Sequence, residues 1–347
     1  MEKLIQPILL DFFDNIEGFT CETLNDGLIN DTFKIWTSSG VFVLQKMNQN
    51  VFTNIEALLN NKIKISRFLN ETNFKTLSFI PNKKGKYYSV FNDEVWQIST
   101  YIPSVVSLKI KSEQQALQLG EYLAKFHKAL LDFPISELQY TIPDFHNTIK
   151  RYDDFGSSIK TATHERLAEA MDSISYLTDN FQNIKKVTMD INEGVIPLRV
   201  VHNDTKVGNM LFDEKGNVIS IIDFDTIMPG SIFHDIGDAM RTGANTSNEE
   251  EKDLSKVCFN VEIYDAFMKG YIEEAKDFMT IEESQNIHLS LPLILFEQAC
   301  RFLSDYLNND IYYATSYEDQ NLVRAKTQIK LFDSVMALQN KQSIFIT

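Results

Sequence analysis

The stretch V-V-H-N-D-T-K-V-G-N-M-L-F, residues 200–212, decides how this 347-residue chain is interpreted. It contains a histidine, an aspartate two residues later, an asparagine five residues after that, and an apolar end. Asp223 follows fourteen residues after Asn209, within I-I-D-F-D (221–225). A turn-forming segment, 213–217, separates the two apolar runs. The pattern therefore predicts strand, turn and strand with polar residues at both ends.

These residue types suit the transfer of a phosphoryl group from ATP to a hydroxyl. The reaction needs a group that receives the hydroxyl proton and oxygen ligands for a metal ion that neutralises phosphate charge. Magnesium keeps several waters, so one amide and one carboxylate suffice as protein ligands. The spacing predicts Asp204 as the catalytic base and Asn209 and Asp223 as Mg²⁺ ligands.

A simpler interpretation is a hairpin whose polar residues only cap turns. The occurrence of both motifs in this order favours the catalytic interpretation. We expect His202 to brace the loop rather than carry a proton. Two roles stay open for Asp225, contact with a second metal ion and bracing of the loop.

The composition excludes some classes of function. The chain has 48 acidic and 33 basic residues, a formal net charge of −15, so no basic excess exists to neutralise nucleic-acid phosphates. The three cysteines are far apart and fit no zinc spacing. The first residues lack the basic start, the longer apolar stretch and the cleavage site of a signal peptide. The apolar run 289–296 is too short to span a bilayer. We expect a cytoplasmic protein without nucleic-acid or membrane partners, and the sequence does not indicate its oligomeric state.

The hydrophobic pattern changes near residue 102. Before it, alternating runs predict a hairpin (32–36 and 41–44) and further strands, with one helix at 54–69. After it, helical periodicity dominates. We therefore predict an α+β fold, with a small β-rich lobe over 1–102 and a larger, mainly helical lobe over 103–347. The other predicted strands are 76–80, 87–91 and 95–100, and the other predicted helices are 113–131, 144–160, 164–183, 257–276, 281–307 and 320–337.

Several blocks resemble the aminoglycoside phosphotransferase and choline kinase superfamily, whose members share a protein-kinase-like bilobal fold. The similarity is greatest to the N-acetylhexosamine 1-kinases. It is carried by V-H-N-D-T-K-V-G-N-M-L-F-D (201–213), I-I-D-F-D-T-I-M-P-G (221–230), D-I-G-D-A-M-R-T-G-A-N-T (235–246) and R-F-L-S-D-Y-L (301–307), with I-N-D-T-F (29–33) near the N-terminus.

The resemblance implies an ATP site in the N-terminal lobe. The loop that covers the phosphates corresponds to residues 25–32, which contain a single glycine and include Gly27, Asn30 and Thr32. Lys46 corresponds to the strand-borne cation that pairs with ATP phosphates, and Glu56 is the nearest candidate to orient it. From the residues alone, a solvated strand-end lysine is the favoured interpretation, and the resemblance reverses that preference. Thr100 to Ile102 correspond to the hinge that binds adenine through backbone groups.

The same resemblance implies that Arg301 and Tyr312 contact the sugar. From the residues alone, Arg301 could instead form an ion pair with Asp305, one turn along the helix. Asn308 to Asp310 suggest a helix break, which leaves the position of Tyr312 open. Asp235 or Asp238 is expected to brace Arg241.

The predicted activity is phosphorylation of the anomeric hydroxyl of an N-acetylhexosamine, with ATP and Mg²⁺ as cofactors. One alternative is a kinase for another small hydroxylated acceptor, such as an aminoglycoside, choline or homoserine. The acidic run 248–253 is the feature that would suit a cationic acceptor. Another alternative is a non-catalytic nucleotide-binding protein, which the presence of Asp204, Asn209 and Asp223 disfavours.

Overall fold

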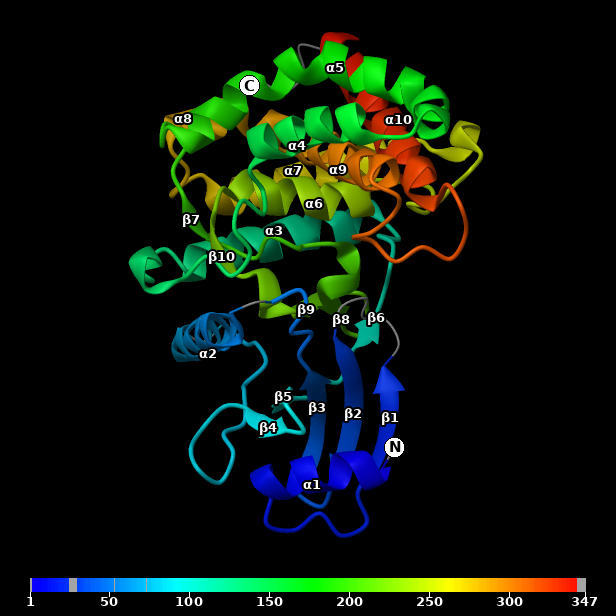
Figure 1. Ribbon diagram of the computed structural model, residues 1–347. Coiled ribbons are helices and arrows are strands. Elements are labelled where there is room, and N and C mark those ends of the chain that lie inside the picture. The colour runs from blue at the N-terminus through cyan, green and yellow to red at the C-terminus, as the bar shows by residue number, and fades with distance from the viewer. Residues whose placement is uncertain (1, 25–29, 53, 73, 342–347) are drawn as a thin grey trace. The chain divides into compact units, whose positions relative to one another are not determined.

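The computed structural model describes residues 2–24, 30–52, 54–72 and 74–341 (Figure 1). Its internal contacts divide the chain into two compact units. The first comprises Met1–Val105, Ala129–Pro143 and Leu211–Pro229, and the second comprises Val106–Lys128, Asp144–Met210 and Gly230–Thr347. A sheet dominates the first unit and helices dominate the second, which confirms the predicted α+β class.

The strands are short and most of the helices are long. The strands are β1 (Thr20–Leu24), β2 (Asp31–Thr37), β3 (Gly40–Lys46), β4 (Ser89–Phe91), β5 (Glu94–Thr100), β6 (Val105–Val106), β7 (Arg199–Val201), β8 (Met210–Phe212), β9 (Val218–Ile221) and β10 (Met228–Gly230). The α-helices are α1 (Glu2–Phe12), α2 (Ile55–Glu71), α3 (Glu113–Ala129), α4 (Thr148–Thr161), α5 (His164–Asn192), α6 (Ile232–Gly243), α7 (Val261–Ala275), α8 (Ile281–Asn286), α9 (Ser290–Leu307) and α10 (Gln320–Lys341).

The first unit is built on an antiparallel sheet in the order β1-β2-β3-β5-β4. The predicted hairpin forms β2 and β3, with Phe33 opposite Leu44. The predicted strand 76–80 was wrong, because this segment makes only a single bridge, from Phe79 to Ser99. Two backbone hydrogen bonds to β5 flank this bridge, from the Ile80 N–H to the Ile98 carbonyl at 2.9 Å and from the Thr100 N–H to the Ser78 carbonyl at 2.8 Å. The ladder stops there, because the Ser78 N–H donates to the Thr100 hydroxyl.

The two faces of this sheet are covered by different helices (Figure 1). Successive side chains of a strand point to opposite faces. Leu44 and Ile98 pack with α1 residues in one core cluster. Val95, of opposite parity to Ile98, packs with Leu58 and Leu59 of α2 in another cluster. One face is therefore the α1 face and the other the α2 face.

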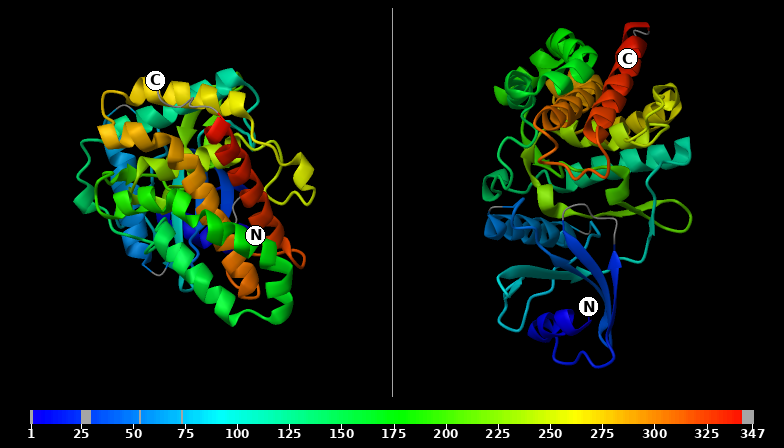
Figure 2. Two further views of the ribbon diagram at one scale, coloured as in Figure 1. Left: turned by 90° about the horizontal axis from the view of Figure 1, so that it is seen from above. Right: turned by 45° about the vertical axis from the view of Figure 1, so that its right-hand side comes forward.

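The second unit is organised around α9, in which most residues are buried. Helices α4, α5, α6 and α10 all contact α9, and α9 and α10 lie side by side in both views of Figure 2. A Cβ added at Gly237 of α6 would lie 2.3 Å from the Ser290 carbonyl oxygen, so the two helices approach closely where only glycine fits. Among the helices described, none combines the length and apolar character that a membrane span requires.

Candidate active site

The loop that carries Asp204 follows β7 in the second unit and is fixed by a buried aspartate. Asp235, in the first turn of α6, accepts hydrogen bonds from the backbone N–H groups of His202 (2.8 Å) and Asn203 (2.6 Å). It also bonds the Nε2 atom of His127 at 2.9 Å. Burial raises the pKa of Asp235, but these partners, His127 first, outweigh burial and hold the pKa below its usual value. An ionised anchor therefore holds the loop.

Asp204 and Asn209, predicted as base and metal ligand, lie together. The Asn209 amide nitrogen donates to the Asp204 backbone carbonyl (2.8 Å) and to Oδ2 (2.9 Å). Lys206, which the sequence analysis did not single out, donates to the same Oδ2 at 2.8 Å. His202 is fully buried, and its Nδ1 accepts from the Asp204 N–H at 3.3 Å, in keeping with the expected bracing role.

The electrostatics of this loop favour an ionised base. Burial raises the pKa of Asp204, but the charge and hydrogen bond of Lys206 outweigh it, and the net effect lowers the pKa. A carboxylate with a low pKa is unprotonated at neutral pH. Asp204 is therefore ready to accept a hydrogen bond from an incoming hydroxyl.

Each of the two predicted magnesium ligands, taken by itself, has donor chemistry that suits the ion. The amide nitrogen of Asn209 donates to Asp204. The amide oxygen of Asn209, Oδ1, has no protein donor in the described part of the chain. Asp223 lies in the first unit, two residues after the end of β9, with a left-handed backbone (φ 71°). An amide oxygen and a carboxylate are ligands that Mg²⁺ accepts. Within the residues described, no three His, Cys, Asp or Glu side chains gather in a metal-holding group.

Asp225, two residues after Asp223, contacts a lysine that the sequence analysis missed. Its Oδ1 accepts a hydrogen bond from Lys62 Nζ, and the two side chains are nearly inaccessible to solvent. Its Oδ2 accepts from the Asn30 amide nitrogen at 2.6 Å. The Asn30 side chain, predicted to contact the cofactor, is thus engaged within the protein. These contacts favour the bracing role for Asp225.

Lys46 lies on the opposite face of the sheet from Lys62. Because side chains alternate along β3, the Lys46 side chain lies on the same face of the sheet as that of Leu44, which packs on the α1 face. Its Nζ pairs with Asp31 at 2.6 Å and Glu94 at 3.3 Å, whereas the expected partner Glu56 is exposed on α2. The ATP contact of Lys46 stays a prediction, and Gln45 takes the α2-face position.

The remaining predicted ATP residues lie in the first unit or outside the described residues. Gly27 falls outside them. Thr32, near the start of β2, is partly buried and accepts from Gln45 Nε2 at 3.5 Å. Thr100 ends β5 and accepts from the Ser78 N–H through its hydroxyl at 2.9 Å. The carbonyl of Ile102 accepts from the Ser104 hydroxyl at 3.1 Å.

Arg301, predicted to contact the acceptor, lies on α9 between two aromatic rings. Its guanidinium carbon is 5.1 Å from the centre of the Phe145 ring and 5.9 Å from that of Tyr313. Neither aromatic was singled out from the sequence. In the described part of the chain the guanidinium has no hydrogen-bond or ion-pair partner. Its N–H donors are therefore free for a ligand.

The alternative ion pair between Arg301 and Asp305 is wrong, because Asp305 is used elsewhere. Its carboxylate accepts from the backbone N–H groups of Tyr312 (2.8 Å) and Tyr313 (2.9 Å). The helix ends at Leu307, as the sequence suggested. Asp305 holds the following loop so that Tyr313 faces Arg301, while Tyr312 is 62% exposed and packs edge-on against Tyr313.

A buried charged group lies one turn before Arg301. The Glu297 carboxylate bonds His146 Nδ1 at 2.8 Å and accepts from the Thr148 hydroxyl at 2.7 Å. Burial raises the pKa of Glu297, but His146 outweighs it and lowers the pKa to about 2. His146 Nε2 in turn lies 3.1 Å from the Asn203 carbonyl, next to the base. This pair connects α9 to the loop that carries Asp204.

The acidic run 248–253 is largely paired with basic side chains of the same unit. Glu249 pairs with Arg241, and Glu250 pairs with Arg324. Arg241 also bonds Asp238 Oδ1 at 2.8 and 2.9 Å, which confirms the expected bracing contact. Asp238 Oδ2 is buried and has no hydrogen-bond partner among the described residues. The run is therefore not an open acidic cluster for a cationic acceptor.

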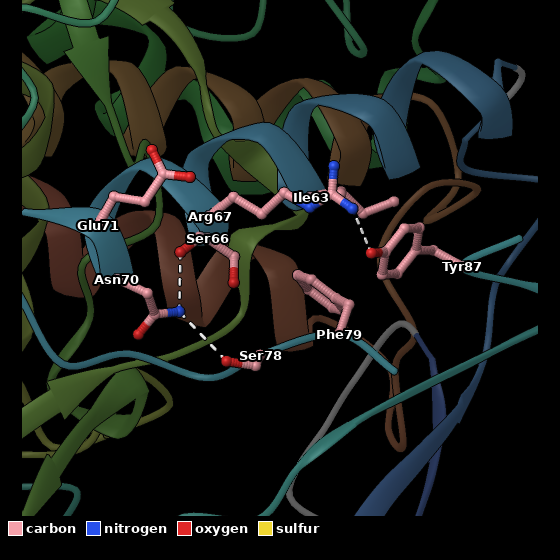
Figure 3. Close-up of a pocket in the computed structure, with 8 residues that line it drawn as sticks. All are labelled: Ile63, Ser66, Arg67, Asn70, Glu71, Ser78, Phe79 and Tyr87. Carbon is pink, nitrogen blue, oxygen red and sulfur yellow. Dashed lines mark hydrogen bonds between the residues drawn. The ribbon is translucent and has the colours of Figure 1, made fainter. Parts of the chain in front are cut away.

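A hollow of about 310 Å³ lies in the first unit, apart from the predicted site residues (Figure 3). Asn70 on its wall donates to the Ser66 carbonyl at 2.8 Å and to the Ser78 hydroxyl at 3.2 Å. The hollow is lined by Ile63, Ser66, Arg67, Asn70, Glu71, Ser78, Phe79 and Tyr87. No predicted catalytic, metal or acceptor residue is among them.

Residues 20–271 match the model of the phosphotransferase enzyme family, over more than half of the chain. The chain belongs to this family. This match confirms, at the level of the family, the superfamily that the catalytic blocks predicted. The narrower resemblance to N-acetylhexosamine 1-kinases is not tested by this match.

Solved structures of two other phosphotransferases and of a choline kinase have folds similar to that of this chain. An aminoglycoside phosphotransferase from Alicyclobacillus acidocaldarius is 13% identical, with 97% of this chain and 96% of that chain covered and a TM-score of 0.64. A spectinomycin phosphotransferase in complex with ADP and spectinomycin is 14% identical over 98% of both chains, with a TM-score of 0.61. A choline kinase from Cryptosporidium parvum is 14% identical over 95% of both chains, with a TM-score of 0.57. These likenesses confirm the predicted kinase-like fold.

Proposed function

We propose that the phosphotransferase transfers the γ-phosphoryl group of ATP to the anomeric hydroxyl of an N-acetylhexosamine. The single observation that carries the transfer step is the Asp204 carboxylate, held by Lys206 and Asn209 on a loop anchored by Asp235. Solved structures of similar fold include a spectinomycin phosphotransferase with ADP and an amicoumacin kinase with AMP-PNP and Ca²⁺, which supports ATP and a divalent ion here.

The proposed chemistry uses few protein groups. Asp204 accepts the proton of the acceptor hydroxyl as its oxygen bonds to the γ-phosphorus, and ADP leaves with the electrons of the broken P–O bond. Lys206 keeps Asp204 ionised until the hydroxyl arrives. Asn209 and Asp223 would hold a magnesium ion, which supplies charge neutralisation to the phosphates.

The acceptor side supports a neutral, hydroxyl-rich molecule. Arg301 offers unpaired N–H donors next to two aromatic rings, and sugars bind through such hydrogen bonds together with an apolar ring face. We place Arg301 and Tyr312 at the acceptor, with Tyr313 between them. Because Glu249 and Glu250 pair with arginines, a cationic acceptor such as choline or an aminoglycoside is the weaker candidate.

An ADP-release screen tests this proposal. Free hexoses, N-acetylhexosamines, aminoglycosides, choline and homoserine would be offered with ATP and Mg²⁺, and the product examined by phosphorus NMR. We expect turnover with an N-acetylhexosamine and a phosphate on the anomeric carbon. Turnover only with a cationic acceptor would replace the substrate assignment, and ATP binding without turnover on any acceptor would contradict the kinase assignment.

A further inference from the structure

Lys62 is a charged residue in the apolar stripe of α2. Leu58, Ile65 and Leu69 on this helix are fully buried, and Lys62 lies among them with 1% of its surface exposed. A buried ammonium is strongly unfavourable unless a counter-charge accompanies it. The position of Lys62 therefore depends on its partner.

That partner, Asp225, has both of its carboxylate oxygens engaged. Oδ1 accepts from Lys62 and Oδ2 from Asn30, whose own Oδ1 accepts from the Asn48 N–H at 3.0 Å. The Lys62 ammonium also lies 5.4 Å from the centre of the Phe79 ring. Helix α2, the start of β2 and the segment after β3 thus meet at one side chain of the I-I-D-F-D motif.

The residue before Lys62 holds the same turn from a second point. The Asn61 amide nitrogen donates to the Ile227 carbonyl at 3.0 Å and to the Gln139 carbonyl at 2.8 Å, while its oxygen accepts from the Gln139 N–H at 3.1 Å. Asn61 is 1% exposed. Two adjacent residues of α2 therefore hold the side chain of Asp225 and the backbone of Ile227.

The turn held in this way begins at a residue with a left-handed backbone. Asp223 has φ 71°, in a region that residues other than glycine adopt less often, although aspartate and asparagine do so more than the rest. Such conformations persist where the surrounding structure over-determines them, and they gather at functional sites. The contacts of Asp225 and Ile227 lie two and four residues after Asp223 and supply that constraint.

We propose that Asn30, Asn61 and Lys62 form a clamp that fixes the 223–227 turn and thereby aims the Asp223 carboxylate at the divalent ion of the bound nucleotide. They are positioning residues, since they act through Asp225 and the backbone rather than on the reacting atoms. The clamp rests on the proposed function. Residues that orient a metal ligand commonly change metal affinity about 10- to 100-fold when they are replaced.

Equilibrium binding of ATP, without any acceptor, tests the clamp. ATP affinity would be measured by calorimetry in EDTA and in Mn²⁺ for the wild type, Lys62→Met and Lys64→Met. Lys64 is a matched control, because it lies on the same helix but is exposed and pairs with Glu137. We expect Lys62→Met to lose about 10- to 100-fold of the tightening by Mn²⁺. Its affinity in EDTA, and both affinities of Lys64→Met, should stay close to wild type.

A second variant separates positioning from simple stability. Lys62→Met with Asp225→Asn removes both buried charges, so thermal stability should return toward wild type while the Mn²⁺ tightening stays weak. Full Mn²⁺ tightening in this double variant would overturn the clamp. So would an equal loss of ATP affinity in EDTA, which would make Lys62 a direct phosphate contact. If the wild type itself showed no Mn²⁺ tightening, the proposed kinase function would fail together with the clamp.

Discussion

Each unit of the phosphotransferase holds a cation away from bulk solvent, and the two cations have opposite surroundings. Lys62 in the first unit pairs with Asp225, which Asn30 also binds. Arg301 in the second unit lies between Phe145 and Tyr313 and has no anionic partner among the described residues. The N–H donors of Arg301 are available to a ligand, whereas the ammonium group of Lys62 is paired within the fold.

The difference separates cations that hold the structure from cations that are available to a ligand. Removing one member of a buried ion pair leaves the other charge uncompensated, which lowers the free energy of unfolding. Removing an unpaired cation leaves nothing buried without a partner, so folding should hardly change. The loss should then appear in binding. Unfolding and binding measurements on the two sites should therefore give opposite patterns.

The largest effect is expected from Asp204→Asn, which removes the chemistry while both cations stay in place. An amide cannot accept the hydroxyl proton, so kcat should fall about 10²- to 10⁴-fold. Binding of ATP and sugar, followed by calorimetry, should be retained. In this background, the effects of the two cations on ligand binding can be compared without turnover. A kcat within tenfold of wild type would remove Asp204 from the role of base.

Lys62→Met should produce the largest change in stability. The variant leaves Asp225 buried without its counter-charge, and the free energy of unfolding should fall by about 3–5 kcal/mol. Urea denaturation followed by circular dichroism measures this change, with Lys64→Met as control. An unchanged unfolding free energy would show that the two cations do not differ in the way the structure indicates.

Arg301→Met should show the reverse pattern. The KM for the sugar should rise about 10- to 100-fold, the range expected for one or two hydrogen bonds from a charged donor. The unfolding free energy should change by no more than about 0.5 kcal/mol. Arg301→Lys keeps the charge but loses the planar fork, so it should recover only part of the affinity. A change in the KM for ATP alone would contradict the acceptor role.

The histidines near Arg301 should give a smaller, pH-dependent effect. Burial, with His146 adding to it, lowers the pKa of His234 to about 3. Between about pH 6.5 and 3 the unfolded chain therefore binds a proton that the folded protein does not. Stability should decrease as the pH falls through this range, by up to about 1.4 kcal/mol per unit.

Urea unfolding at pH 5 and pH 6.5 measures this slope, and His234→Gln should reduce it. His146 acts in another window. Burial lowers its pKa, but Glu297 outweighs burial and the net pKa is raised. Its stabilising effect is present below about pH 6.5 and is lost as the pH rises above that value. A slope that survives in His234→Gln would assign the proton to another group.

Lys46→Met should have the smallest effect. Its ion pairs with Asp31 and Glu94 are partly exposed, and such pairs contribute about 0–1 kcal/mol. Because its side chain lies on the α1 face, ATP affinity in Mn²⁺ should change less than in Lys62→Met. A loss of ATP affinity above tenfold would support the ATP contact that the sequence predicts for Lys46.

The change of hydrophobic pattern near residue 102 predicted the fold class, and the motif spacing predicted the base and the metal ligands, because these residues lie within one short segment. Neither could reveal Lys62. A lysine within the apolar stripe of α2 is visible in the sequence, but its partner is 163 residues away. Nothing local indicates that pairing. The parity of Leu44 and Lys46 could have been read from the strand pattern, and it would have placed Lys46 on the α1 face.

The acceptor side shows a different limit. The helix break after Leu307 was visible in Asn308 to Asp310, but the path of the next residues depends on the buried Asp305. That path brings Tyr313 to Arg301 and leaves Tyr312 exposed. The predicted strand 76–80 is reduced to a single bridge for a similar reason, because the Thr100 hydroxyl takes the Ser78 N–H that a longer ladder with β5 would use.

The separation between Lys62 and Asp225 also bears on how the chain is made. During synthesis α2 leaves the ribosome well before residue 225, by roughly 8–30 s at ordinary elongation rates. Until then the lysine has no counter-charge, and burying it is unfavourable. We expect α2 to stay undocked on the nascent chain through this interval, so that the N-terminal half completes its core only after the I-I-D-F-D segment has emerged.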